Sequence, residues 1–299
     1  MTISLFLQQL ANGITLGSFF ALVAIGYTMV YSIIRLINFA HSTIFMVNMY
    51  VVFYLISFFL LPWYVAYPIA LIIAALLGII NERVAYYPLR KREAPSKTML
   101  ISSIGVSYFL EYFATVLFTG RPKQFPSLPF LTQSITIGTV ITQRISIVAP
   151  AITLLLLALL TYILHRTKAG LAMRVVSKDL YAAKLMGVDV NKTVSLTFAI
   201  GSALACVGAI IWGIKYPVIS PTVGAIPGVK CFVAAVIGGI GNVNGAVLGG
   251  FLLGILEVMV ITFFPSLTSY RDAISFVILI VILLVKPTGL LSEKTGEKV

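Results

Sequence analysis

Long apolar segments are the feature that most limits how this chain can fold. A helix needs about 20 apolar residues to cross a hydrocarbon core of roughly 30 Å, and the sequence offers several such runs. Only 10% of its residues are charged and 60% are hydrophobic, whereas soluble domains carry roughly 25% charged residues. The sequence therefore predicts an all-α integral membrane protein, a polytopic helical bundle that forms one domain over residues 1–299.

Eight segments approach the length of a membrane span and a ninth is shorter. The eight lie at about residues 10–31, 42–61, 65–81, 98–118, 146–164, 193–214, 246–264 and 273–285. The short one, 231–240, would reach about half-way across at 1.5 Å per residue, as a half-helix or as part of a re-entrant hairpin. We therefore expect about nine membrane segments, within a range of eight to ten.

The distribution of Lys and Arg predicts the orientation, because cytoplasmic loops are enriched in both. With the N-terminus outside, 15 of the 21 basic residues fall in inner loops. The net charge of +12 is accordingly attributed to these loops and to anionic lipid headgroups, and no nucleic-acid partner is expected. The inner set is Arg35, Arg83, Arg90, Lys91, Arg92, Lys97, Arg166, Lys168, Arg174, Lys178, Lys184, Lys192, Lys286, Lys294 and Lys298, and the outer set is Arg121, Lys123, Arg144, Lys215, Lys230 and Arg271.

Polar residues in or beside the apolar segments are candidates for lining a translocation pathway, since intramembrane polar groups usually face the bundle interior. The candidates are Asn38, His41, Asn242, Asn244 and Glu257. Three alternatives remain open: a carboxylate bonded to a neighbouring helix, for Glu257 and more so for Glu111, an interfacial turn for the stretch that holds Asn38 and His41, and plain turn chemistry for the stretch GNVNG. No Cys or carboxylate stands at metal-ligand spacing from a histidine, so no metal site is expected.

Glycines spaced four apart predict close helix contacts, because membrane helices associate where small residues let backbones approach. Gly241, Gly245 and Gly249 form the strongest such row. Gly13 and Gly17 start a second row in the first segment.

The chain has no G-x-x-x-x-G-K-[ST] motif, so we predict no ATP hydrolysis by a P-loop mechanism and no enzymatic activity. It also lacks the relay of charged residues expected of a proton-driven carrier. A transporter of this kind is either a passive or ion-coupled conduit, or a permease driven by a separate ATPase.

The stretch SKDLYAAKLMGVD, within the polar loop 165–192, offers such an ATPase a rigid feature. Ser177 suits an N-cap, Asp179 and Lys184 suit the helix dipole at the two ends, and Gly187 suits a left-handed C′ position. These signals predict a helix of about ten residues. Its apolar side chains favour docking to a partner, and an amphipathic helix on the lipid surface is the alternative. The apolar set is Leu180, Tyr181, Leu185 and Met186.

Four stretches together resemble a known family over nearly the whole chain. They are GYTMVYSIIRLINFAHST, YYPLRKREAPSKTMLISSIGVSYFLEY, GLAMRVVSKDLYAAKLMGVDVNK and AAVIGGIGNVNGAVLGGFLLGILE. The chain resembles the membrane-spanning permeases of bacterial branched-chain amino acid ABC importers, whose relatives also move urea or short amides. It departs from the family pattern at Ser42, Asn48 and Asn244, which leaves the substrate open within that range.

The resemblance implies a division of labour among subunits. The chain would be a multi-pass protein of the bacterial inner membrane, paired with a second permease that is related or identical. Two cytoplasmic ATPases would bind ATP and Mg²⁺, and an extracytoplasmic binding protein would deliver the substrate; this chain would itself bind no cofactor. The third stretch would hold the coupling helix, with Gly170, Arg174, Asp179, Leu180, Ala183, Met186 and Gly187 as the ATPase-coupling residues. The alternative is a stand-alone channel or facilitator for a small neutral solute such as urea.

Overall fold

A computed structural model describes residues 3–126, 128–138 and 140–291 of the chain. Within them, eight helices are long and apolar enough to cross a membrane, and a shorter apolar helix, Ala225–Gly238, lies between the sixth and seventh. The predicted polytopic helical bundle is confirmed. The predicted half-helix exists as well, although it begins at residue 225 rather than 231.

The spanning helices are α1 (Ile3–Ile34), α2 (Ala40–Ser57), α3 (Trp63–Asn81), α5 (Ser96–Phe118), α7 (Ile145–Arg166), α10 (Val190–Lys215), α12 (Val243–Phe263) and α13 (Arg271–Val285). The π-helix η1 (Glu82–Tyr86) and α4 (Tyr87–Lys91) extend α3, the 3₁₀-helix η2 (Pro265–Tyr270) leads into α13, and the short helices are α6 (Pro129–Thr132), α8 (Lys168–Lys178), α9 (Leu180–Leu185) and α11 (Ala225–Gly238). Two small antiparallel ribbons join β1 (Lys123–Gln124) to β4 (Val218–Ile219), and β2 (Ser134–Ile137) to β3 (Val140–Gln143).

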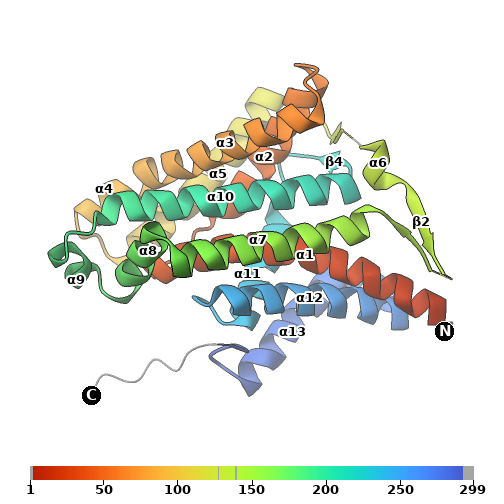
Figure 1. Cartoon of the computed structure of the whole chain (residues 1–299). Coiled ribbons are helices and arrows are strands. Elements are labelled where there is room, and N and C mark those ends of the chain that lie inside the picture. Colours follow the sequence, from red (N-terminus) through yellow and green to blue (C-terminus); the bar gives the residue numbers. More distant parts are fainter. Residues whose placement is uncertain (1–2, 127, 139, 292–299) are drawn as a thin grey trace.

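Helix α1 is the centre of the bundle. It packs against α7, α10, α11 and α12, and Figure 1 shows it running between these helices. Its most apolar stretch is almost wholly buried, whereas few residues of α5, α7 and α13 are buried. Since hydrocarbon can cover such apolar surfaces, these three helices form the outer layer.

Small residues let α1 and α12 approach closely, as the predicted glycine rows required. A Cβ placed on Gly254 would lie 2.3 Å from the backbone nitrogen of Gly17, and one on Gly250 would lie 2.5 Å from the Cα of Ala21. Both neighbours are backbone atoms that cannot rotate away. The contact between the two helices therefore depends on glycine at these positions.

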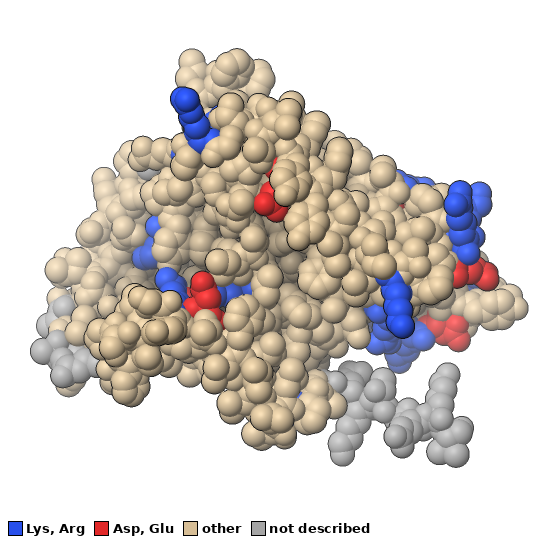
Figure 2. Space-filling model, turned by 180° about the vertical axis from the view of Figure 1, so that it is seen from behind, with Lys and Arg blue, Asp and Glu red and all other residues tan. Residues whose placement is uncertain are grey.

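The two ends of the bundle differ in charge and in structure. The start of α1 lies with β2 and α6 at one end, here called the N-terminal end, and α4, α8 and α9 lie at the other, here called the loop end (Figure 1). Lys and Arg gather mainly at the loop end in Figure 2. There Arg35 donates to the carbonyl of Ser177 (3.1 Å) and Arg90 to the side chain of Asn191 (2.9 Å). Loops that are distant in sequence, and that were predicted to lie on the inner side, therefore contact one another at this end. Lys294 and Lys298 lie outside the described residues.

The short helix α11 completes a crossing together with the turn before it. Strand β4 pairs with β1 at the N-terminal end of the bundle (Figure 1). At the far end of α11, the carbonyls of Ile237 and Gly238 accept from the backbone of Leu290 and Leu291 (2.9 and 3.0 Å). Because these residues follow α13, the chain after α13 returns to the loop end.

Candidate functional site

Helix α8 folds back against the end of α7. The hydroxyl of Thr167 caps it by accepting from the backbone N–H of Gly170 (3.1 Å). A Cβ on Gly170 would lie 2.1 Å from the carbonyl oxygen of Ile163. Gly170, one of the predicted coupling residues, therefore fixes the bend between α7 and α8, whereas Arg174 is exposed on the outer side of α8.

The N-cap prediction at Ser177 is wrong. Ser177 lies in the last turn of α8, where its hydroxyl donates to the carbonyl of Arg174 (2.9 Å). The chain then becomes extended at Asp179, whose carboxylate accepts from the N–H groups of Tyr181 and Ala182 (2.8 and 3.0 Å). Both serine and aspartate can accept hydrogen bonds from the first N–H groups of a helix, and here Asp179 does so. Because the helix begins after Asp179 instead of after Ser177 and ends at Leu185, α9 has six residues instead of about ten.

Gly187 ends this segment as predicted. Its φ of +77° is the left-handed conformation that glycine adopts without strain, and its N–H donates to the carbonyl of Lys184 (3.0 Å). Helix α9 packs on α8 and α10 and buries Ala183 completely. The segment is thus held on one side and capped at both ends.

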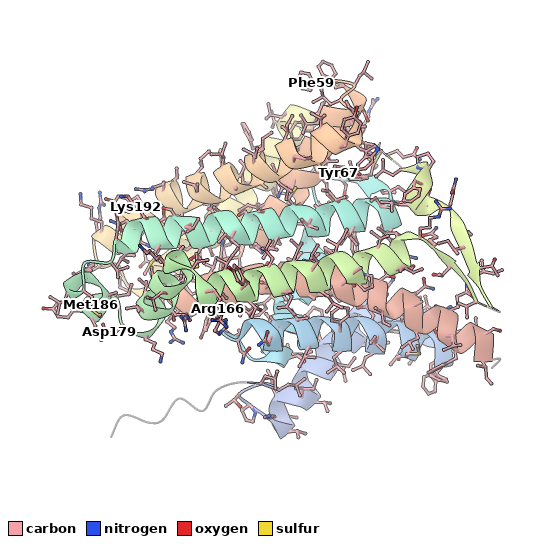
Figure 3. The ribbon with its side chains drawn as sticks, viewed as in Figure 1. Phe59, Tyr67, Arg166, Asp179, Met186 and Lys192 are labelled. Carbon is pink, nitrogen blue, oxygen red and sulfur yellow. The ribbon has the colours of Figure 1, made fainter. Side chains whose placement is uncertain are left out.

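The apolar side chains of α9 point away from the bundle. Tyr181, Leu185 and Met186 are 72%, 72% and 75% exposed, and Leu180 is 39% exposed. Figure 3 shows Met186 and Asp179 at the outermost point of the loop end. We call Leu180, Tyr181, Leu185 and Met186 the α9 patch; an exposed apolar surface of this kind on a positioned helix is typical of a docking site.

Removing the Asp179 cap should loosen α9. We expect Asp179→Ala to destabilise the helix by about 1 kcal/mol, because two backbone donors lose their acceptor. Trypsin should then cut faster at Lys178 and Lys184 in the detergent-solubilised chain. The control is Asp189→Ala, which removes the equivalent cap of α10. The carboxylate of Asp189 accepts from the N–H of Lys192 (3.0 Å), and this hydrogen bond lowers the pKa of Asp189. Equal cutting at Lys184 in both variants would contradict a specific role of Asp179.

A buried carboxylate that the sequence reasoning missed joins α3 to α10. Glu82, the first residue of η1, is fully buried and accepts from Arg90 (2.9 Å) and from the hydroxyl of Ser195 (2.7 Å). A π-helical turn inside an α-helix often marks a functional position. Arg90, assigned above to a loop, therefore belongs partly to the interior, and the spacing of Glu82 and Arg90 along one extended helix was the available signal.

Glu257 lies in a second buried charge cluster. Lys230 of α11 is 2.9 Å from its carboxylate, Arg271 pairs with it, and the hydroxyl of Ser275 donates to it (3.0 Å). Lys230 also pairs with Asp272 (2.7 Å). The assignment of Lys230 to an outer loop is therefore wrong, because its charge is paired inside the bundle. The cluster ties α11, α12 and α13 together.

Asn38 and His41 lie together at the start of α2, facing the bundle interior. The side-chain oxygen of Asn38 accepts from the hydroxyl of Tyr86 (2.9 Å) and from the N–H of Ala40 (3.1 Å). The buried ring of His41 packs edge-on against Tyr27. A Cβ on Gly26 would lie 2.3 Å from this ring, so these contacts hold the turn between α1 and α2.

The GNVNG stretch forms the turn that starts α12. The side chain of Asn242 caps α12 by accepting from the N–H of Gly245 (3.1 Å) and donates to the carbonyl of Leu291 (2.8 Å), while Asn244 is exposed. Gly245 and Gly249 make a close helix contact, as predicted, and their partner is α11. A Cβ added to Gly245 would lie 2.3 Å from the carbonyl oxygen of Gly238, and one added to Gly249 would lie 2.1 Å from that of Ala234. Gly241 does not extend this row, because it lies in the turn with a φ of +100°, and a Cβ added there would meet none of the described residues beyond its chain neighbours within 4 Å.

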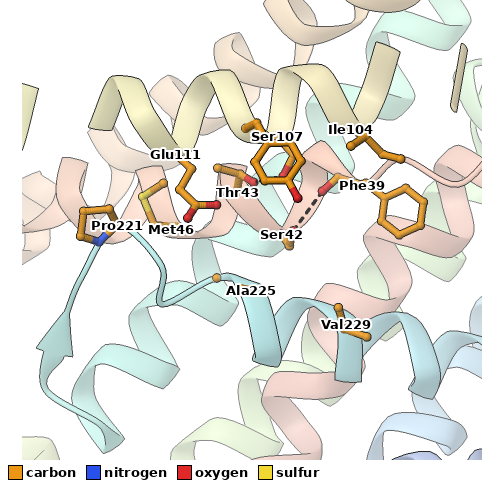
Figure 4. Close-up of a pocket in the computed structure, with 12 residues that line it drawn as sticks. Phe39, Ser42, Thr43, Met46, Ile104, Ser107, Glu111, Pro221, Ala225 and Val229 are labelled. Atoms are coloured by element: carbon orange, nitrogen blue, oxygen red, sulfur yellow. Dashed lines mark hydrogen bonds between the residues drawn. The ribbon is translucent and has the colours of Figure 1, made fainter. Parts of the chain in front are cut away.

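A cavity of about 220 Å³ opens between α2, α5 and the start of α11. Figure 4 shows Glu111, Thr43 and Ser107 on its wall. We call it the Glu111 cavity. Its lining is Phe39, Ser42, Thr43, Met46, Ile104, Ser107, Tyr108, Glu111, Pro221, Gly224, Ala225 and Val229. Phe39, Ser42 and Thr43 thus line it, whereas the predicted Asn38 and His41 do not. The i,i+4 spacing of Ser107 and Glu111 was the signal available in the sequence.

Comparison with known proteins gives full-length matches. The family described as "Branched-chain amino acid transport system / permease component" matches residues 9–283. The chain is 39% identical to the high-affinity branched-chain amino acid transport system permease protein BraD of Pseudomonas aeruginosa and 40% identical to LivH of Escherichia coli, with 98% of each chain covered in both pairs. It is 26% identical to a probable LivH of Methanocaldococcus jannaschii, over 94% of this chain and 91% of that one.

No solved structure gives a significant match. The family match spans the helices that build the bundle, and both of the bacterial relatives are covered nearly end to end. The chain belongs to the family of branched-chain amino acid transport system permease components.

Proposed function

We infer that this chain is the membrane-spanning subunit of an ATP-binding-cassette importer for branched-chain amino acids in the bacterial inner membrane. It would work with a second permease, two cytoplasmic ATPases that bind ATP and Mg²⁺, and an extracytoplasmic substrate-binding protein. The names of the relatives support the substrate class and the transport system. The eight apolar spanning helices support the location.

The observation that carries the proposal is the α9 patch. Caps at Asp179 and Gly187 hold a short helix at the loop end, and three side chains of the patch, those of Tyr181, Leu185 and Met186, are largely exposed. Such a helix can transmit force because it is positioned by α8 and α10. We assign this surface to the ATPase, with the loop end in the cytoplasm, and ATP-driven closure of the ATPase dimer would move α9 as a lever.

Pull-down of the ATPase tests the assignment. The tagged chain is co-expressed with the products of its neighbouring genes and purified in mild detergent. We expect Leu185→Asp and Met186→Asp to reduce the recovered ATPase about tenfold, because a charge in the centre of a docking contact costs more than 1.4 kcal/mol. Leu171→Asp, an exposed leucine on α8 outside the patch, is the matched control.

The outcomes separate the proposal from its alternatives. Loss of the ATPase with the two patch variants and retention with Leu171→Asp support docking through α9. Recovery of no ATPase with the wild-type chain would contradict the proposal and favour the stand-alone facilitator. Equal recovery with all variants would move the docking surface elsewhere.

A further inference from the structure

Glu111 differs from the other two carboxylates in the bundle interior. Glu82 and Glu257 are both paired with cations and hydroxyls. Among the described residues, the carboxylate of Glu111 accepts no hydrogen bond and has no ion pair; only its backbone carbonyl is engaged, by Thr115. A charged group in a membrane segment is costly and usually meets a partner or a water-filled cavity. The half-buried Glu111 lines the wall of the Glu111 cavity.

The cavity has a polar part and an apolar part. Ser107, four residues before Glu111 on α5, bonds to the hydroxyl of Thr43 on α2 (2.5 Å). Ser42 also lines the cavity, and its hydroxyl donates to the backbone carbonyl of Phe39 (3.0 Å). Ile104 and Val229 line the opposite end, as Figure 4 shows. Ile104 and Glu111 are about 10 Å apart along the helix axis at 1.5 Å per residue. A small molecule with an ammonium group and a branched aliphatic tail would fit such a cavity, with the ammonium group at the carboxylate and the tail against the apolar wall.

The position of the cavity suits a transport pathway. Ser107 is the midpoint of α5 (Ser96–Phe118), and the close approach of α11 to α2 at Ser42 closes the cavity on one side: a Cβ on Gly228 would lie 2.1 Å from that of Ser42. On the other side, Tyr108 is largely exposed. A second permease subunit packed on this face would enclose the cavity.

We propose that the Glu111 cavity binds the α-ammonium group of the amino acid during translocation, with Glu111 as the counter-charge and Ile104 and Val229 against the aliphatic side chain. This inference rests on the proposed function for the identity of the cargo. The carboxylate, the hydroxyls and the apolar wall are the features that assign the cavity to an aliphatic ammonium ion.

Cysteine protection tests the site directly. Both native cysteines, Cys206 and Cys231, are buried, so the background labelling is low. Ser107→Cys is introduced into the assembled transporter in detergent, and its reaction with a charged methanethiosulfonate reagent is timed in sodium-free buffer. The probes are leucine, 3-methylbutylamine, which keeps the ammonium and lacks the carboxylate, and 4-methylpentanoate, which does the reverse. Gly105→Cys, two residues away with open space around it, is the matched control.

We expect leucine and 3-methylbutylamine to slow the labelling of Ser107→Cys and 4-methylpentanoate to leave it unchanged. Adding Glu111→Gln should weaken the protection about tenfold, since a hydrogen bond to a charged group is worth roughly that factor in affinity, and Glu111→Asp should retain part of it. Labelling of Gly105→Cys should respond to none of the probes.

Several results would overturn the assignment. Equal protection by leucine and 4-methylpentanoate, or protection that survives Glu111→Gln, would remove the ammonium site. The ligand comparison needs only Ser107→Cys, so it decides the matter even where Glu111→Gln does not fold. A transporter that imports leucine while leucine and 3-methylbutylamine leave Ser107→Cys unprotected would refute this inference and keep the proposed function. Protection by the amine in a complex that imports no leucine would refute the proposed cargo and keep the ammonium site.

Discussion

Gly254→Leu is expected to prevent the chain from assembling into a stable bundle. A Cβ at this position would lie 2.3 Å from the backbone nitrogen and 2.4 Å from the Cα of Gly17, so α12 must move away from α1. Overpacking of a tight contact costs about 1–3 kcal/mol, and here it would also separate the central helix from one of its main partners. The loss should therefore exceed that range.

Fluorescence-detected size-exclusion chromatography of a detergent extract measures this effect. Gly254→Leu should give aggregate or no peak, while Gly254→Ala should give a reduced peak. Gly105→Leu is the control, because a Cβ added at Gly105 would meet no other described element within 4 Å, and it should elute as the wild type does. A monodisperse Gly254→Leu protein with an unchanged melting temperature would show that α1 and α12 do not pack as described.

Glu257→Leu should produce the second large loss of stability. The substitution leaves Arg271 without its carboxylate and leaves Lys230 with Asp272 alone, which is half-exposed. Removing one partner from a buried ion pair costs about 3–5 kcal/mol, and the loss here should lie toward the lower end of that range, because Lys230 keeps Asp272 and Arg271 is 35% exposed. Glu257→Gln should cost less, since the amide oxygen still accepts from Ser275 or Lys230.

Thermal unfolding in detergent compares these variants with Asp272→Asn. We expect the melting temperature to fall most for Glu257→Leu, less for Glu257→Gln and least for Asp272→Asn, whose carboxylate is partly hydrated. A melting temperature for Glu257→Leu equal to that of Asp272→Asn would mean that the cluster is not desolvated as the geometry indicates.

Most of the fold could be predicted from the sequence, because a span is defined by local composition. Sequence reasoning failed where a charge was paired over a long distance. Lys230 looked like the boundary of the segment 231–240, since an unpaired lysine is costly in a membrane. Its partner Glu257 lies 27 residues away, and nothing local reveals the pair. Glu82 has both a distant partner, Ser195 in α10, and a local one, Arg90 eight residues along the same extended helix; only the local pair could have been read from the sequence.

Local signals were more ambiguous in the α8–α9 segment. Ser177 and Asp179 both suit an N-cap, and the choice between them depended on α8, which was not predicted as a separate helix. The Gly187 end was correct because glycine at a left-handed position has a single common use. The Glu111 cavity could not be assembled from the sequence, since Thr43 and Ser107 are 64 residues apart and only packing brings them into contact.

The most direct test of the account is substrate uptake by proteoliposomes that contain this chain with its co-expressed partner subunits and binding protein. The account predicts that leucine and valine accumulate only when ATP and Mg²⁺ are supplied on the ATPase side, that urea does not accumulate, and that Met186→Asp abolishes uptake while the bundle stays folded. Leucine or urea flux through vesicles that hold this chain alone, without ATP, would contradict it.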